Sequence, residues 1–70
     1  MLYIAKLCND NNISKTAIAL ILDIRPKQAS RKIDNTCQFT IKELYLLKDW
    51  FVKQKILTED FDIGTFLNDA

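Results

Sequence analysis

Side chains that can bind phosphate groups or the edges of nucleic-acid bases gather in one short stretch of this sequence. The segment Ile24–Lys42, here called the basic segment, contains five cations and one acid, Asp34. The five cations are Arg25, Lys27, Arg31, Lys32 and Lys42. Arg and Lys donate to guanine O6 and N7, and an amide such as that of Gln28 pairs with adenine N6 and N7. The chemistry that these residues offer is the binding of a polyanion.

Groups that could serve catalysis or hold a metal are scarce. The chain has no His, one Gly and two isolated cysteines, Cys8 and Cys37. A zinc site needs a cluster of Cys and His ligands, and covalent catalysis needs a nucleophile beside a base. We therefore predict that the protein is not an enzyme and uses no metal or cofactor. Cys8 is expected in the core and Cys37 in a loop.

The net charge of +1 conceals an uneven distribution. From Thr58 to the end of the chain there are four acids and no base, so an acidic tail balances the basic segment. Such an asymmetry favours oriented binding to a polyanion. The sequence also lacks an apolar run of about 18 residues and a signal-peptide pattern, so we expect a cytoplasmic protein without a membrane partner.

The cations of the basic segment are predicted to lie on the second of two short helices. The first helix runs from about Lys15 to Leu22, with Ser14 as its N-cap, and the second from about Pro26 to Ile33. An apolar helix that holds a cationic helix at a fixed angle is the helix-turn-helix plan, in which the second helix enters the major groove of DNA. The alternative is two ordinary helices of a small bundle with solvated lysines.

The residues around these two helices are suited to ending and starting them. Asp23 and Asn35 follow the helices, and both residue types tolerate the left-handed backbone that closes a helix. Pro26 suits the first turn of a helix and forces Arg25 into an extended conformation. We therefore expect a sharp break at Asp23–Arg25.

Helices are also predicted on both sides of this pair. Apolar residues recur with helical spacing from Met1 to about Asp10. Thr40 and Glu43 match a capping box, which predicts a helix that runs to about Val52. A last short element is predicted to begin at Thr58 and to be broken by Gly64. No stretch alternates like a strand, so residues 1–70 are expected to form a single all-α domain with four to five helices.

The run from Ala19 to Phe51 resembles the phage repressor and Cro-type helix-turn-helix DNA-binding proteins. Members often show an Ala-x-x-Leu-Gly turn, a short recognition helix, Arg-Lys-Ile-Asn-Gly, a Phe-Thr cap and a Glu-Leu helix. The matching residues here are Ala19, Leu22, Arg31-Lys32-Ile33, Phe39-Thr40 and Glu43-Leu44. Asp23 and Asn35 stand where glycines are usual. The resemblance implies a lambda-repressor-like fold and a sequence-specific transcriptional regulator of a phage or mobile element, acting in the cytoplasm of a bacterial host.

The resemblance also implies roles for individual side chains toward a double-stranded DNA operator. The residues expected to contact bases, from the start of the recognition helix and one turn later, are Lys27, Gln28, Ser30 and Arg31. The residues expected to contact phosphates, near helix starts and turns, are Ser14, Lys15, Arg25, Asn35, Thr36 and Lys42.

The sequence contains more large apolar residues than one small core is expected to bury, which indicates a surface for a partner. One small DNA-binding unit makes few base contacts, so useful specificity needs two copies on a two-fold site, and we expect a homodimer on DNA. The residues expected on a dimer or partner surface are Leu20, Ile21, Phe66 and Leu67. The alternative hypothesis is a protein-interaction module, an antirepressor or modulator, that keeps the fold and binds a partner repressor through exposed apolar residues.

Overall fold

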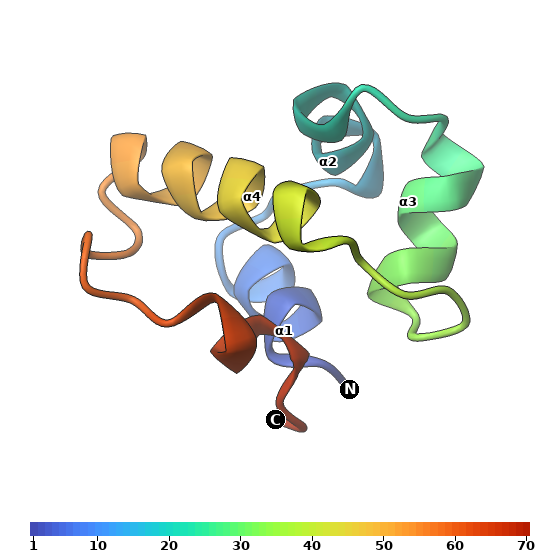
Figure 1. The fold of residues 1–70 in the computed structure, drawn as a ribbon. Helices are drawn as coiled ribbons and strands as arrows, with labels where there is room; N and C mark the ends of the chain where they lie inside the picture. Colours follow the sequence, from blue (N-terminus) through green and yellow to red (C-terminus); the bar gives the residue numbers. More distant parts are fainter.

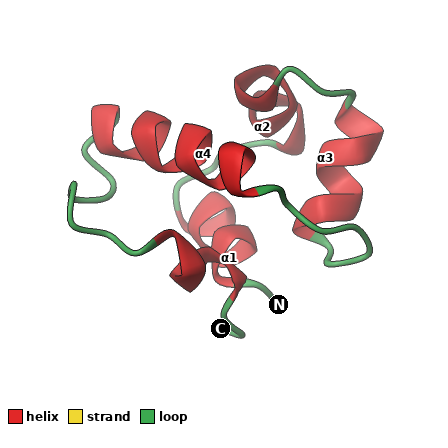
Figure 2. Ribbon diagram, viewed as in Figure 1, coloured by secondary structure: helices red, strands yellow, loops and turns green.

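Four α-helices and one 3-10 helix form the protein, and its computed structural model describes all 70 residues. The elements are α1 (Tyr3–Asp10), α2 (Lys15–Leu22), α3 (Pro26–Ile33), α4 (Ile41–Lys53) and the 3-10 helix η1 (Ile63–Leu67). Figure 1 shows α4 crossing the molecule, with α2 and α3 on one side and α1 and the C-terminal segment below it. No strand is present (Figure 2), which confirms the predicted all-α class.

The helices α2 and α3 begin and end where the sequence predicts. The Ala17 amide donates to the Ser14 hydroxyl at 3.1 Å and so caps α2. Asp23 has φ 56° and ψ 47°, the left-handed conformation that stops α2. Arg25, which precedes Pro26, is extended at φ −74° and ψ 148°. The break between the two helices is therefore a direct result of local backbone preferences.

The start of α4 is the predicted capping box. The Glu43 amide donates to Thr40 Oγ1 at 3.1 Å, and the Thr40 amide donates to Glu43 Oε1 at 2.8 Å. The helix ends at Lys53, one residue after the predicted Val52. Leu44, like Phe39 ahead of the cap, is buried and anchors the beginning of α4 on the core.

The prediction for the C-terminal element is wrong in its start and in the role of Gly64. Thr58 begins a turn, because the Phe61 amide donates to the Thr58 carbonyl at 3.1 Å. The helical turn begins only at Ile63, where Asp62 acts as the cap and accepts from the Gly64 amide at 3.0 Å. Gly64 thus lies inside η1. Asp is as good a cap as Thr, and the later start is the one that brings Phe66 to the core.

The core consists of apolar side chains only, and Phe66 lies within it. Its ring centroid is 5.9 Å from that of Phe51 and 4.8 Å from that of Phe61, and the residue is fully buried. The placement of Phe66 on a partner surface is therefore wrong. The cause is tertiary: the C-terminal segment turns back and packs η1 against α1 and α4 (Figure 1).

The two ends of the chain are bonded to each other. The Tyr3 amide donates to the Asn68 carbonyl and the Ala70 amide to the Met1 carbonyl, both at 2.8 Å. An isolated antiparallel bridge joins Leu2 to Asp69, whose carboxylate also pairs with the terminal ammonium at 3.2 Å. None of the helices has the length and apolar composition that crossing a lipid bilayer requires.

Candidate nucleic-acid interface

The helix α3 lies at the edge of the molecule and presents two different faces. Ala29 and Ile33 are buried at 0% and 4% exposure, and they hold α3 on the core beside α2. Lys27, Gln28 and Arg31 are exposed to solvent. In Figure 1 no other element lies outside α3. The helix is therefore held along one apolar stripe and leaves its polar side chains accessible to a ligand.

Most of the cations of the basic segment have no acidic partner. Arg25, Lys27, Arg31 and Lys42 are exposed and take part in none of the ion pairs of the protein. We call these four residues the free cations. They come from the turn before α3, from α3 itself and from the first turn of α4. An anion that approaches them would not have to displace a carboxylate.

Lys32, the fifth cation of the basic segment, belongs to the scaffold. Its Nζ donates to Glu43 Oε1 at 2.8 Å and to the Gln38 carbonyl at 2.9 Å, and it lies 5.9 Å from the centre of the Phe39 ring. The Lys32 and Glu43 side chains are each only 12% exposed. Burial alone would raise the pKa of Glu43, but the hydrogen bonds from Lys32 and Thr40 outweigh it and leave this pKa below its ordinary value. Lys32 therefore ties α3 to α4.

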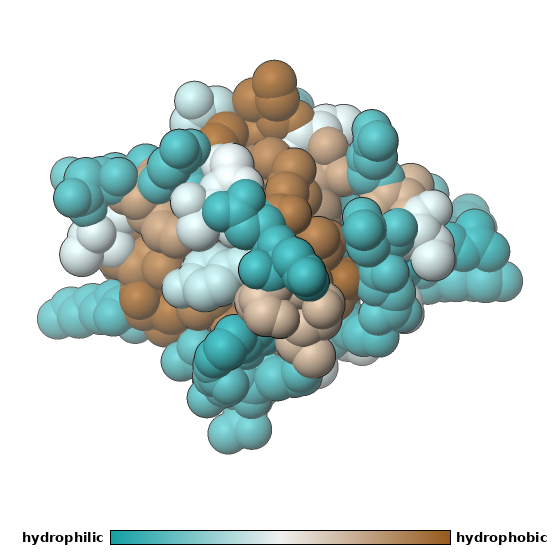
Figure 3. Space-filling model, turned by 90° about the horizontal axis from the view of Figure 1, so that it is seen from below, coloured by the Kyte–Doolittle hydropathy of each residue, from teal (hydrophilic) through white to brown (hydrophobic).

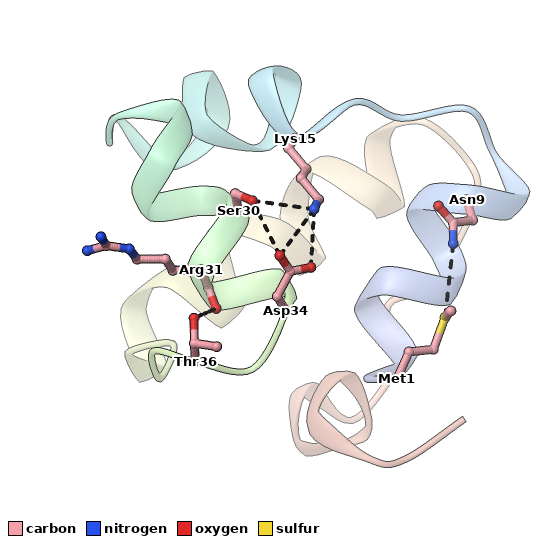
Figure 4. Close-up of polar contacts among 7 residues, drawn as sticks. All are labelled: Met1, Asn9, Lys15, Ser30, Arg31, Asp34 and Thr36. Atoms are coloured by element: carbon pink, nitrogen blue, oxygen red, sulfur yellow. Dashed lines mark hydrogen bonds and ion pairs between the residues drawn. The ribbon is translucent and has the colours of Figure 1, made fainter.

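Lys15, Ser30 and Asp34 form a polar cluster between the start of α2 and the end of α3 (Figure 4). Lys15 Nζ lies 3.1 Å and 3.3 Å from the two carboxylate oxygens of Asp34 and 3.4 Å from the Ser30 hydroxyl. The Ser30 hydroxyl also donates to Asp34 at 3.4 Å. Arg31 points away from this cluster in Figure 4. The structure thus separates Ser30 from Arg31, although both were expected to contact bases.

The other residues expected at bases or phosphates are exposed, but several already hold hydrogen bonds. The Ser14 hydroxyl is occupied as the cap of α2, and Gln28 Oε1 accepts from the Arg25 amide at 3.3 Å. Asn35 is left-handed with φ 65°, and Thr36 Oγ1 donates to the Arg31 carbonyl at 3.0 Å. Asn35 and Thr36 thereby close the end of α3 and leave the Arg31 side chain free.

Several large apolar side chains are exposed away from the core. Leu20 is 79% exposed and Leu67 43% exposed, so both are accessible, whereas Ile21, also expected on a dimer or partner surface, is partly buried against the core. Sequence patterns missed three more exposed residues on α4, Ile41 at 69%, Tyr45 at 58% and Leu46 at 39%. Seen from below, the surface shows hydrophobic patches with hydrophilic side chains between and around them (Figure 3). Apolar surface is therefore available for a protein partner.

A groove of about 600 Å³ lies between α1, the start of α2, the end of α3 and the C-terminal segment. Its wall includes Ile13 and Ile33 together with the ion-paired Lys15 and Asp34. The local sequence contains no signal for this groove, because its walls come from four segments that are distant along the chain. Nowhere in the structure do three His, Cys, Asp or Glu side chains converge in a way that could hold a metal ion.

Comparison of the chain with protein-family models, with curated proteins and with solved structures finds no match. What the arrangement offers is an accessible helix with Lys27, Gln28 and Arg31 on its outer side, flanked by Arg25 and Lys42. All five side chains can donate hydrogen bonds, and all except Gln28 carry positive charge, which suits them to phosphates and to base edges.

Proposed function

We propose that this protein binds double-stranded DNA as a sequence-specific transcriptional regulator. In this proposal α2 and α3 form a helix-turn-helix within a lambda-repressor-like fold, and α3 enters the major groove. The observation that carries the proposal is the set of free cations on and beside an α-helix at the edge of the molecule. An α-helix fits the width of the major groove, so the side chains on its outer face can reach the bases.

The proposed contacts fall into two groups. Lys27 and Arg31 read guanine, and the free amide nitrogen of Gln28 reads an acceptor on a neighbouring base. Arg25 and Lys42, on either side of α3, bind backbone phosphates and set the register of the helix on the duplex. The longest dimension of the protein is 29 Å, so one copy covers only about eight base pairs at ~3.4 Å per step. Two copies on a two-fold operator would supply the specificity that one copy lacks.

A binding experiment with one matched control tests the proposal. A preferred site is first selected from a random duplex library, and affinities are then measured by fluorescence anisotropy. We expect Arg31→Ala to weaken binding to that site by about 1–3 kcal/mol and to relax preference at one base position. Lys55→Ala removes another exposed cation without an ion pair, from the turn after α4, and should change the affinity little. Equal losses in the two variants would contradict a role for α3.

A protein-interaction module is the second candidate, and the exposed Leu20, Ile41 and Tyr45 favour it. In that case the protein binds a partner, such as a repressor, through apolar contacts. Salt separates the two functions, because DNA affinity falls steeply with salt concentration while apolar binding does not. Leu20→Glu would abolish partner binding and leave affinity for a single DNA half-site unchanged. Partner binding that survives Leu20→Glu would exclude Leu20 from the partner surface.

A further inference from the structure

Asp34 is the only acid of the basic segment, and its position is unfavourable for α3 itself. It is the C-cap of this helix. Carbonyl groups at a helix C-terminus carry partial negative charge, so a carboxylate there is disfavoured. Helix stability therefore does not account for this residue. Its ion pair is with another element, at Lys15 in the first turn of α2.

The ion pair between Asp34 and Lys15 neutralises the cation nearest to the amino end of α2. The carboxylate meets Lys15 Nζ with both oxygens, at 3.1 Å and 3.3 Å, and the Ser30 hydroxyl contacts both partners (Figure 4). The two side chains are 48% and 54% exposed, so solvent and ions reach the pair. An exposed pair of this kind adds little to stability. It can therefore be broken by a competing anion.

We propose that Asp34 limits the sequence-independent part of DNA binding by occupying Lys15. A phosphate that approaches the amino end of α2 meets a lysine that is already paired and a carboxylate that repels it. The helix amides and an unpaired Lys15 would otherwise form a favourable phosphate site. Asp34 thus leaves affinity to depend more on the base contacts of Lys27 and Arg31. Since this role exists only if α3 binds DNA, it rests on the proposed function.

Asp34→Asn is the test, and the protein contains a closely matched control. Asp10 pairs with Lys6 at 2.8 Å, and those side chains are 51% and 56% exposed, so Asp10→Asn removes the same charge from an equally exposed pair on α1. The probe is a short fluorescent duplex of arbitrary sequence. At low salt, about 50 mM, we expect Asp34→Asn to bind it roughly three- to tenfold more tightly than wild type, and Asp10→Asn less than about twofold.

Salt dependence and a second substitution identify the cause of the gain. One additional phosphate contact adds about 0.9 to the salt slope, so the advantage of Asp34→Asn should shrink about 3.5-fold between roughly 50 and 200 mM salt. Lys15→Gln should change wild-type affinity less than about twofold, because the lysine is already occupied, but should remove the gain in the Asp34→Asn background. Urea midpoints for each variant verify that the fold is retained.

Failure of the role of Asp34 and failure of the proposed function give different results. Equal gains for Asp34→Asn and Asp10→Asn, or a gain that survives Lys15→Gln, would overturn the role of Asp34 and leave the proposed function standing. A large loss on Lys15→Gln in the wild-type background would also overturn it, since Lys15 would then bind phosphate despite the pair. Failure of every variant to bind duplex DNA at low salt would overturn the proposed function and this role together.

Discussion

Lysine side chains in this protein have three different environments, and the environment decides what each can do. Lys32 is nearly buried and holds Glu43 at 2.8 Å, so its charge is used inside the scaffold. Lys15 is half-exposed and occupied by Asp34. Lys27 is exposed and has no ion pair. Only an exposed cation without an ion pair, such as Lys27, can bind an incoming anion without first losing an acidic partner.

The pair between Lys32 and Glu43 leads to a prediction about pH. The pKa of Glu43 is lowered on folding, so its stabilising effect is present above its ordinary value of 4.5 and is lost as the pH falls through the folded pKa. At neutral pH we expect Glu43→Gln to lower the free energy of unfolding by about 1–3 kcal/mol. Gln can keep the bond from the Thr40 amide, so the substitution isolates the charge.

Urea unfolding of wild type and Glu43→Gln across the acid range measures this effect. The difference between them should shrink as the pH falls below 4.5. Glu59→Gln serves as the control, since Glu59 is exposed and forms no ion pair. A difference that stays constant with pH would mean that packing, and not charge, makes Glu43 important.

The two cysteines should differ strongly in reactivity. Burial raises the pKa of the Cys8 thiol to about 11, so Cys8 stays protonated near neutral pH, and its side chain is also shielded. Cys37 is exposed. Because the thiolate is the reactive form, an alkylating reagent should label Cys37 quickly in the native protein and Cys8 only when the protein unfolds. Both should react in concentrated urea. Equal native rates would contradict the burial of Cys8.

At the scale of elements, the capping residues determine where helices start. Ser14 and Thr40 both accept from the amide three residues later, at 3.1 Å in each case. The C-cap of each of the four α-helices is, or directly precedes, a non-glycine residue in the left-handed conformation. These residues are Asn12, Asp23, Asn35 and Lys55. The turn before α3 and the loop after it contain no glycine, so their backbones have few accessible conformations. These two short segments therefore help to fix the orientation of α3.

Loss of the Thr40 cap should therefore destabilise the protein without affecting the proposed DNA contacts. We expect Thr40→Ala to lower the free energy of unfolding by about 1 kcal/mol, because the Glu43 amide loses its acceptor. Thr16→Ala is the matched control, as Thr16 is exposed inside α2 and its hydroxyl forms no hydrogen bond within the protein. Urea midpoints measure both variants. Equal midpoints would place the start of α4 elsewhere.

At the scale of the whole molecule, the C-terminal segment completes the core. Phe66 is fully buried between Phe51 and Phe61, while the adjacent Leu67 is 43% exposed. Backbone hydrogen bonds from Tyr3 to Asn68 and from Ala70 to Met1 hold this segment against the start of α1. The acidic tail thus acts as a structural element, and only part of it is left for a partner.

Truncation of Phe66 should be the most damaging of these changes. We expect Phe66→Ala to lower the free energy of unfolding by about 3–5 kcal/mol, because it leaves a cavity in the core of a small protein. Leu67→Ala removes a neighbouring apolar side chain from a half-exposed position and should have a much smaller effect. Thermal and urea unfolding of both variants test this. Similar losses would mean that the segment docks as a unit without a dominant residue.

The sequence by itself determined the features that depend on a few neighbouring residues. The bounds of α2 and α3, the capping box of α4 and the left-handed Asp23 and Asn35 all follow from local backbone and capping preferences. Helical spacing of apolar residues likewise indicated α1 and the all-α class. These preferences act within about one helical turn, so they can be read without knowledge of the fold.

Only the tertiary structure decided which charges are free and which apolar residues are exposed. Asp34 meets Lys15 across 19 residues, and Glu43 meets Lys32 across 11. Thr58 and Asp62 are both residue types that can cap the start of a helix. The structure uses Asp62 as the cap of η1, and with this start Phe66 docks in the core. Pairings at this distance depend on loop paths and on the packing of side chains from several elements. A residue's own type and its near neighbours do not contain that information.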